Sequence, residues 1–454
     1  NALRIDGQFN ETDGAGIFGY VEKDWEAPDQ GVTGQVGSID ITADQVRLLN
    51  HGKINVAAHQ SPDTPAMDQV DSRVRIVARL LELDGGYIDA NTNGPVAAAA
   101  IEIQADQLHL ANGAQVNTNT SGSGSAGHIG LSARSITLDG FGTQITSSTL
   151  AGSGGNAGQL TIRVADTLAL SDQAWILTDT SGMGAAGSID LQAHNLSLID
   201  GASITSHAEE QSGGPVGNIA ISAQRLAILN SAEISIDARQ TLAPDRLAQT
   251  PLGQIMLSVD DFTLNDATLS ARSHGNVPAS AIVIHSKDTR LTDSAITTDS
   301  LLADAGPIRL QGGLAWLTDG QITTSANGPA GDGGDINLNV DHLILDGGFI
   351  QANTAAVGAS GGDIRIDTRT IISNQNQLTV GGAERQSMVS GSGYNVIQAA
   401  APGGEQGNIL VTAPAFDITA SLVPLATPFQ DPDALLADLC RTVSGPHANS
   451  LVER

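Results

Sequence analysis

The side chains that most often perform catalysis or bind metals are scattered through this sequence of 454 residues. The ten histidines include no His-x₃-His or similar pair, so metal ligation is not expected. The adjacent carboxylates Asp260 and Asp261 have neither a Gly-His-Gly nor an Arg-x-Lys partner nearby, and nothing among the 49 acidic residues selects a glycosidase pair. We therefore predict no catalytic residue, no metal ligand and no cofactor site, and we interpret Asp260-Asp261 as an outward polar strand start.

The glycine-rich segments and the single cysteine offer little further chemistry. No Gly-x₄-Gly-Lys-[Ser/Thr] phosphate loop occurs. Residues 331–335 (Gly-Asp-Gly-Gly-Asp) are the best calcium candidate, but they lack the repeated nonapeptide of calcium-binding β-rolls, so we interpret them as a solvated turn. With only Cys440, a disulfide within the chain and a cysteine-based zinc site are both excluded. Cys440 is expected either to pack as a small apolar residue or to pair with another chain.

Four aromatic residues remain as candidates for contact with a ligand. Trp175 and Trp316 fall beside inward apolar positions and are predicted to be flat outward rings, which can stack on sugars. Tyr20 and Trp25 belong to the irregular stretch 6–36. The alternative for each is ordinary exposure, because isolated surface aromatics are common.

The charge balance excludes several classes of partner. Asp and Glu outnumber Lys and Arg by 49 to 21, which gives a net charge of −28. Such a chain is not expected to bind nucleic acid, which requires basic patches, or to dock on anionic lipid. No apolar run approaches the ~20 residues of a membrane helix, so membrane insertion is not expected. The composition fits a soluble extracellular surface.

A repeated element, Gly-x-Ile-x-Ile, organises nearly the whole chain. It occurs in thirteen copies about 30 residues apart, three of them without the glycine. The first apolar residues of the copies are Ile39, Val74, Ile101, Ile129, Leu160, Ile189, Ile219, Ile255, Ile282, Ile308, Ile336, Ile364 and Ile409. Because aromatic residues make up only 3% of the chain, the expected core is long and thin, filled by Ile, Leu, Val and Ala.

Each copy has the same internal pattern, as residues 187–217 illustrate. Ile189-Asp-Leu191 and Leu196-Ser-Leu198 alternate with period two, an Asp-Gly corner follows, and Ala202-Ser-Ile204 leads into a polar loop. Alternation of this kind indicates strands. Equivalent strands at a fixed period should stack in register, with Ile189, Ile219, Ile336 and Ile364 inside. The sequence therefore predicts an all-β fold, a right-handed parallel β-helix of about thirteen coils with three short strands per coil.

The pattern also suggests boundaries. Residues 1–36 are expected to be an irregular N-terminal segment or an incomplete first coil, residues 37–420 the β-helix, and residues 421–454 a tail. A short capping helix is predicted at 433–440, where Asp431-Pro432 resembles a helix start. Two insertions interrupt the repeats, one at 238–252 with a predicted helical turn and a Gly/Ser-rich loop at 381–406.

The repeats resemble the filamentous-haemagglutinin-like exoproteins of bacterial two-partner secretion systems. The resemblance covers roughly residues 30–454 and is carried by Gly-Gly-Asp-Ile-Arg-Ile (361–366), Gly-Asp-Gly-Gly-Asp-Ile-Asn-Leu (331–338), Leu-Asp-Gly-Gly-Phe-Ile-Gln-Ala (345–352) and the tail at 431–440. It implies a secreted protein at the bacterial outer cell surface, and an outer-membrane transporter as partner. That transporter reads an N-terminal secretion domain with an Asn-Pro-Asn-Gly motif, which this sequence lacks. The domain is expected to have been removed or to lie upstream of Asn1.

Two classes of function follow from these observations. The first is a structural or adhesive protein, secreted or held at the cell surface, that binds a cell-surface or glycan receptor through the rod and has no catalytic site. Within the same class, end-to-end self-association could build a filament or a surface layer, because β-helix ends expose strand edges. The second class is a β-helix polysaccharide lyase or hydrolase. Charged groups converging on adjacent coils would distinguish the enzyme, and we identify none in the sequence.

Overall fold

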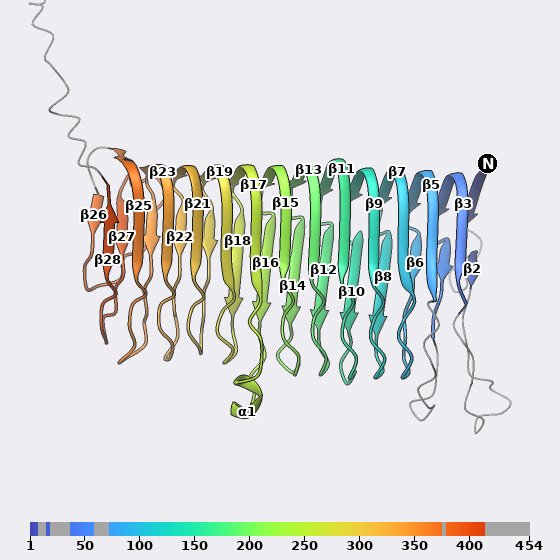
Figure 1. Ribbon diagram of the computed structural model, residues 1–454, viewed down its shortest axis with the longest axis horizontal. Coiled ribbons are helices and arrows are strands. Elements are labelled where there is room, and N and C mark those ends of the chain that lie inside the picture. Colours follow the sequence, from blue (N-terminus) through green and yellow to red (C-terminus); the bar gives the residue numbers. More distant parts are fainter. Residues whose placement is uncertain (8–14, 19–36, 59–71, 375–377, 414–454) are drawn as a thin grey trace, which may run out of the picture. The chain divides into compact units, whose positions relative to one another are not determined.

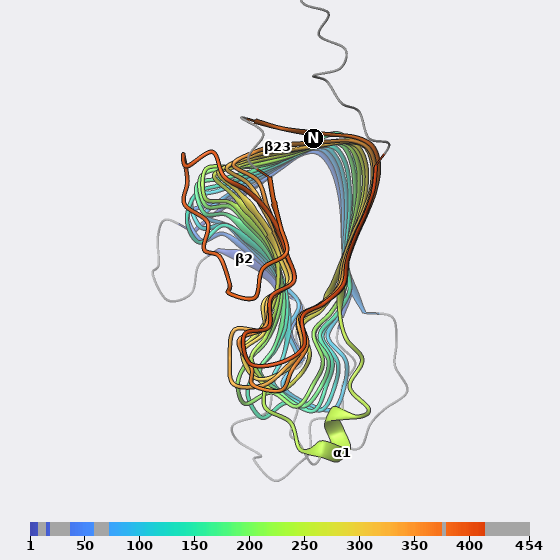
Figure 2. The same cartoon turned by 90° about the vertical axis from the view of Figure 1, so that its left-hand side faces the viewer.

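The computed structural model describes residues 1–7, 15–18, 37–58, 72–374 and 378–413. Residues Asn1–Ala413 belong to one compact unit, a right-handed parallel β-helix. Successive coils lie side by side along the solenoid (Figure 1) and superpose when it is viewed along its axis (Figure 2). The predicted capping helix 433–440, Cys440 and the boundary near residue 420 lie outside the described residues.

Two parallel sheets, here called sheet A and sheet B, form the walls of the solenoid, and each holds fourteen strands. In order, sheet A contains β1 (Ala2–Asp6), β3 (Ile39–Leu49), β5 (Arg73–Asp84), β7 (Ala100–Ala111), β9 (Ile129–Asp139), β11 (Leu160–Ser171), β13 (Ile189–Leu198), β15 (Ile219–Leu229), β17 (Gln254–Asn265), β19 (Ala281–Thr292), β21 (Ile308–Thr318), β23 (Ile336–Asp346), β25 (Ile364–Ser373) and β28 (Ile409–Thr412). Sheet B contains β2 (Gly16–Phe18), β4 (Lys53–Asn55), β6 (Tyr87–Asp89), β8 (Gln115–Thr120), β10 (Gln144–Thr149), β12 (Trp175–Thr180), β14 (Ser203–Ala208), β16 (Glu233–Ala238), β18 (Thr268–Ser273), β20 (Ala295–Thr297), β22 (Gln321–Thr323), β24 (Phe349–Gln351), β27 (Asn395–Gln398) and β26 (Leu378–Val380).

The prediction of three short strands per coil needs correction. The first two predicted strands of the copy at 187–217 are the two ends of the single strand β13. Pairing with β15 continues up to Ala193 and resumes at Asn195, so only the residue between them, His194, is skipped. Because one skipped residue does not end the ladder of hydrogen bonds, each coil has one long strand in sheet A and one shorter strand in sheet B.

The number of coils also differs slightly from the prediction. About eleven coils are regular, each a sheet A strand followed directly by its sheet B strand, from β3–β4 to β23–β24. The last two copies, which begin at Ile364 and Ile409, supply β25 and β28 to sheet A. Their sheet B strands are out of order, because β27 pairs with β24 and β26 lies outside it. The long segment between β26 and β27 breaks the regular winding there.

The predicted apolar ladder is confirmed. Ile189 pairs with Ile219 and Ile336 pairs with Ile364, and each of the four side chains is at most 1% exposed. The core continues through the coils as stacked Ile, Leu and Val residues that are buried between the two sheets. Burial of these aliphatic side chains is the main favourable term in the stability of the solenoid.

The glycine that opens most copies is required by close packing between coils. A Cβ atom on Gly187 would lie 1.9 Å from the carbonyl oxygen of Gly158, and one on Gly158 would lie 1.8 Å from that of Gly127. The buried Thr178 hydroxyl donates a hydrogen bond to the Gly187 carbonyl oxygen at 2.7 Å. The glycines therefore allow successive coils to approach closely at the place where a side chain of sheet B forms a hydrogen bond with the backbone just before the next strand of sheet A.

The helix α1 (Pro244–Leu247) lies within the insertion 238–252, as predicted. No helix among the described residues is both long and apolar enough to span a bilayer.

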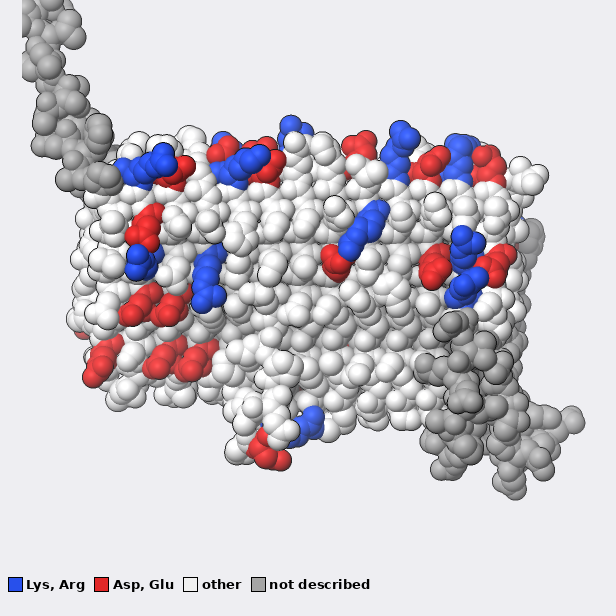
Figure 3. Space-filling model, viewed as in Figure 1, with Lys and Arg blue, Asp and Glu red and all other residues white. Residues whose placement is uncertain are grey.

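In the view of Figure 3, Lys and Arg side chains lie next to Asp and Glu along the upper edge and in several places below it, whereas two short rows at the lower left hold acidic side chains alone. Many of the side chains with opposite charges form ion pairs between neighbouring coils, such as Arg79–Asp44 at 2.9 Å and Arg47–Glu82 at 3.0 Å. The hydrogen bond from Arg79 holds the pKa of Asp44 below its usual value. Exposed pairs of this kind contribute little to stability, but they neutralise much of the sparse positive charge.

Candidate functional site

The outer face of sheet B gathers the side chains that could bind a ligand. In β12 the side chains of Ile176, Thr178 and Thr180 are buried inside the solenoid, and the alternate residues Trp175 and Asp179 point outward. Because the coils stack in register, equivalent outward residues form rows that run along the solenoid. Each row presents one side chain per coil at intervals of about 4.8 Å.

One of these rows is rich in ionisable groups. Asp179 is aligned in turn with His207, Asp237 and Arg272 on the next three strands of sheet B. Ser273 and Ser300 form a parallel β-bridge. The residues just before them, Arg272 and Asp299, are therefore aligned as well, so Asp299 continues the row. A neighbouring row contributes three more ionisable side chains. We call the two rows the charged patch, which consists of Asp179, His207, Glu209, Asp237, Arg239, Arg272, His274 and Asp299.

Asp237 lies at the centre of the charged patch and is only 6% exposed. Its Oδ2 accepts a hydrogen bond from Arg239 Nε at 2.7 Å, and its Oδ1 lies 2.9 Å from His274 Nδ1. Arg239 also reaches Glu209, with 3.5 Å between Nη1 and Oε2. The buried carboxylate is therefore paired on both oxygens, and it fixes the positions of two more exposed polar side chains.

Four side chains of the charged patch have shifted pKa values. Burial raises the pKa of Asp179 and of Asp299, and it lowers the pKa of His207. The hydrogen bond to Asp237 raises the pKa of Arg239. One oxygen of Asp179, Oδ1, is buried and has no hydrogen-bond partner. Perturbed groups that are concentrated in one place are typical of functional sites.

Trp175 lies on the same outward face of β12 as Asp179. Its indole Nε1 donates a hydrogen bond to Gln144 Oε1 at 2.7 Å. The ring of Phe141, which is 74% exposed, meets it edge to face with centroids 6.1 Å apart. These two contacts hold the indole in one orientation, four residues along β12 from Asp179 and in register with Thr268 of β18.

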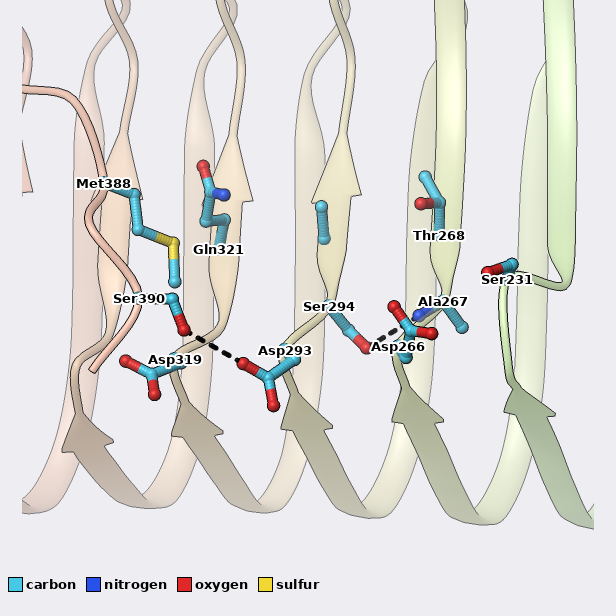
Figure 4. Close-up of a pocket in the computed structure, with 11 residues that line it drawn as sticks. Ser231, Asp266, Ala267, Thr268, Asp293, Ser294, Asp319, Gln321, Met388 and Ser390 are labelled. Atoms are coloured by element: carbon cyan, nitrogen blue, oxygen red, sulfur yellow. Dashed lines mark hydrogen bonds between the residues drawn. The ribbon is translucent and has the colours of Figure 1, made fainter.

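A pocket of about 440 Å³ lies at the starting ends of the sheet B strands from β16 to β22, across the sheet from the charged patch (Figure 4). Carboxyl groups from the turns of three consecutive coils line it, and the segment 388–391 of the second insertion closes one end. The hydroxyl of Ser390 donates to Asp293 Oδ1 at 3.2 Å, and the backbone N–H of Gly391 donates to Asp319 Oδ1 at 2.9 Å. The other lining residues are Ser231, Asp266, Ala267, Thr268, Ser294, Ala295, Gln321 and Met388.

The structure places the two described aromatic candidates on different sheets. Trp175 is on sheet B, whereas Trp316 is on β21 of sheet A, where it is 41% exposed. Tyr20 and Trp25 lie outside the described residues. Of the two described candidates, Trp175 is the one on the outer face of sheet B, in the row that leads to Thr268 and Gln321 of the pocket.

The acidic turn at 331–335 helps to join neighbouring coils. Asp332 Oδ1 accepts the backbone N–H of Ser360 at 2.7 Å, and Asp335 Oδ1 accepts that of Asp363 at 2.9 Å. Among the residues that the structure describes, no group of three or more His, Cys, Asp or Glu side chains is arranged to hold a metal ion.

The charged patch was missed in the sequence because its members are about 30 residues apart. Contiguous motifs such as Gly-His-Gly cannot reveal residues that meet only through stacking. The usable signal is the position within the repeat. Aligning the copies by their sheet B strands places Asp179, His207, Asp237, Arg272 and Asp299 at one equivalent position.

Asp89, on the same face, provides a test of burial. Burial raises the pKa of Asp89 to about 6, although Asn117 donates a hydrogen bond to it and Lys53 is nearby. Because this pKa lies above the ordinary value of 3.8 for an aspartate, the carboxyl group favours folding most below pH 3.8, and this contribution is lost as the pH rises through 6. We expect Asp89→Asn to increase the free energy of unfolding by about 2 kcal/mol near pH 8 and to change it little near pH 4.

Denaturant unfolding of Asp89→Asn at the two pH values measures this effect. The control is Asp44→Asn, which removes a carboxylate whose pKa is lowered by Arg79. This substitution should not stabilise the fold at either pH. An equal gain for Asp89→Asn at both pH values would contradict the assignment.

With the fold and this face described, the chain can be classed as a parallel β-helix repeat protein. No family model, no curated protein and no solved structure was found to match it.

Proposed function

We propose that this chain is a secreted or cell-surface structural and adhesive protein that binds its receptor through the outer face of sheet B and has no catalytic site. The observation that carries this proposal is the stacking in register of outward polar and aromatic side chains over consecutive coils. A face that repeats with every coil suits an extended receptor. Few small substrates could use more than one or two of its coils.

The resemblance to filamentous-haemagglutinin-like exoproteins supports the route to the cell surface. It implies an outer-membrane transporter as the secretion partner and a cell-surface or glycan molecule as the receptor. Protease treatment of intact source cells tests the location, with antibody detection of the chain. We expect the chain to be digested while a cytoplasmic marker stays intact, and protection of the chain until the cells are lysed would refute the proposal.

A polysaccharide lyase or hydrolase is the second candidate, because the charged patch places ionisable groups on adjacent coils. The pairing within the patch favours adhesion. Both oxygens of Asp237 already face Arg239 and His274, so neither oxygen is free to take a proton from a substrate or a water molecule.

We therefore expect the purified protein to release no products from polygalacturonate, xylan or cellulose, measured as new reducing ends and as unsaturated uronates. Turnover that is lost in His274→Asn while the thermal unfolding midpoint is unchanged would establish the enzyme instead. The matched control is His285→Asn, which changes an exposed histidine on β19 of sheet A.

A further inference from the structure

We propose that the outer face of sheet B, from Trp175 to the segment 388–391, binds an uncharged linear polysaccharide that lies parallel to the solenoid axis. This inference rests on the proposed adhesive function and names the chemistry of the receptor.

The spacing of the side chains favours a polymer. Strands β12, β14, β16, β18, β20 and β22 are consecutive neighbours in sheet B. Their five intervals of about 4.8 Å extend over about 24 Å. A linear chain lying along this direction follows the row that begins at Trp175 and continues through Glu233 and Thr268 to Gln321 at the pocket. The charged patch forms a parallel row, four residues or about 13 Å away across sheet B.

The chemistry of the face suits hydroxyl groups, which both donate and accept hydrogen bonds. In the row that begins at Trp175, Glu233 offers acceptor oxygens, and Thr268 and Gln321 offer both donors and acceptors. The fixed indole of Trp175 provides a flat apolar surface for the C–H face of a sugar ring.

The charge of the face argues against acidic polysaccharides. Four carboxyl groups lie in the charged patch (Asp179, Glu209, Asp237 and Asp299), and three more line the pocket (Asp266, Asp293 and Asp319). The patch supplies only two guanidinium groups, and one of them, that of Arg239, is already bound to Asp237 and Glu209. Uronate or sulfate groups on a ligand would therefore be repelled, whereas neutral sugars would not.

The segment 388–391 sets the far end of this face. Ser390 and Gly391 lie 97 and 72 positions along the chain from the aspartates they contact, Asp293 and Asp319. The insertion thus folds back over earlier coils and crosses the line that the ligand would follow. The insertion therefore bounds the face at one end, about 24 Å from Trp175, so a ligand must span this length to contact both.

Isothermal titration calorimetry with the whole chain tests the proposal. The probes are cello-, manno- and malto-oligosaccharides from disaccharide to octasaccharide, together with heparin and polygalacturonate. We expect at least one neutral series to bind, with an affinity that rises with length until the ligand spans about 24 Å and then levels off. Trp175→Ala should weaken binding by about tenfold, and the matched control Trp316→Ala should leave it unchanged.

Three results would overturn the inference: no binding of any neutral series, tighter binding of the acidic polymers, or equal affinity for Trp175→Ala and the unaltered protein. Circular dichroism of each variant separates lost binding from lost folding. The proposed function can fail independently of the inference. If the chain is exposed at the surface and adheres to cells but neutral oligosaccharides do not displace it, the adhesive function stands and the ligand is wrong. If the chain is intracellular, the proposed function is wrong, whatever the calorimeter shows.

Discussion

Replacing Ile336 with aspartate should unfold the centre of the solenoid. Ile336 is fully buried and lies between Ile308 and Ile364 in the inward ladder. An aspartate there would place a carboxyl group among stacked aliphatic side chains that offer it no partner. The group would have to be buried either as an unpaired charge or as a neutral acid without a hydrogen bond. We expect a loss of about 4 kcal/mol in the free energy of unfolding, at the upper end of single substitutions. Denaturant titration followed by circular dichroism measures it.

The control for Ile336→Asp is Asn337→Ser, one position along the same strand. Asn337 is only half-buried and lies at an outward position of β23, so its replacement should shift the unfolding midpoint very little. Comparable losses for the two variants would contradict the alternation of inward and outward residues. Because repeat proteins can unfold in parts, midpoints from two probes should be compared before a free energy is assigned.

Replacing Gly187 with alanine should force two coils apart. The new methyl group would lie 1.9 Å from the carbonyl oxygen of Gly158, which is backbone and cannot rotate away. The clash would also disturb the hydrogen bond from Thr178 to the Gly187 carbonyl oxygen. We expect a destabilisation of about 3 kcal/mol, at the upper end of what overpacking usually causes. The thermal unfolding midpoint should fall accordingly.

Gly37→Ala is the matched control, because Gly37 occupies the same position of the repeat in the first copy. A Cβ atom on Gly37 would have no neighbour within 4 Å among the residues that the structure describes. This variant should therefore keep the unfolding midpoint of the unaltered protein. If the two alanine variants have the same unfolding midpoint, close packing between coils is not the reason for the glycine in the repeat. The backbone conformation of the glycine itself would then be the reason.

The sequence alone predicted the class of fold and the inward ladder. The period of about 30 residues indicated stacked coils, and the alternation of Ile189-Asp-Leu191 indicated which side chains point inward. Both inferences depend only on local geometry, because successive residues of a strand point to opposite faces. The joining of two predicted strands into β13 could not be predicted, since it depends on hydrogen bonds to neighbouring coils that continue past one skipped residue.

What the sequence by itself determined is therefore the coil, its buried residues and the polar character of its outer face. The tertiary structure decided which polar residues meet. Asp237 lies 37 positions from His274, and Asp293 lies 97 positions from Ser390, so neither contact follows from any local pattern. The physical reason is that period and alternation fix the direction of a side chain, whereas its neighbours across coils depend on how the coils stack and where an insertion folds back.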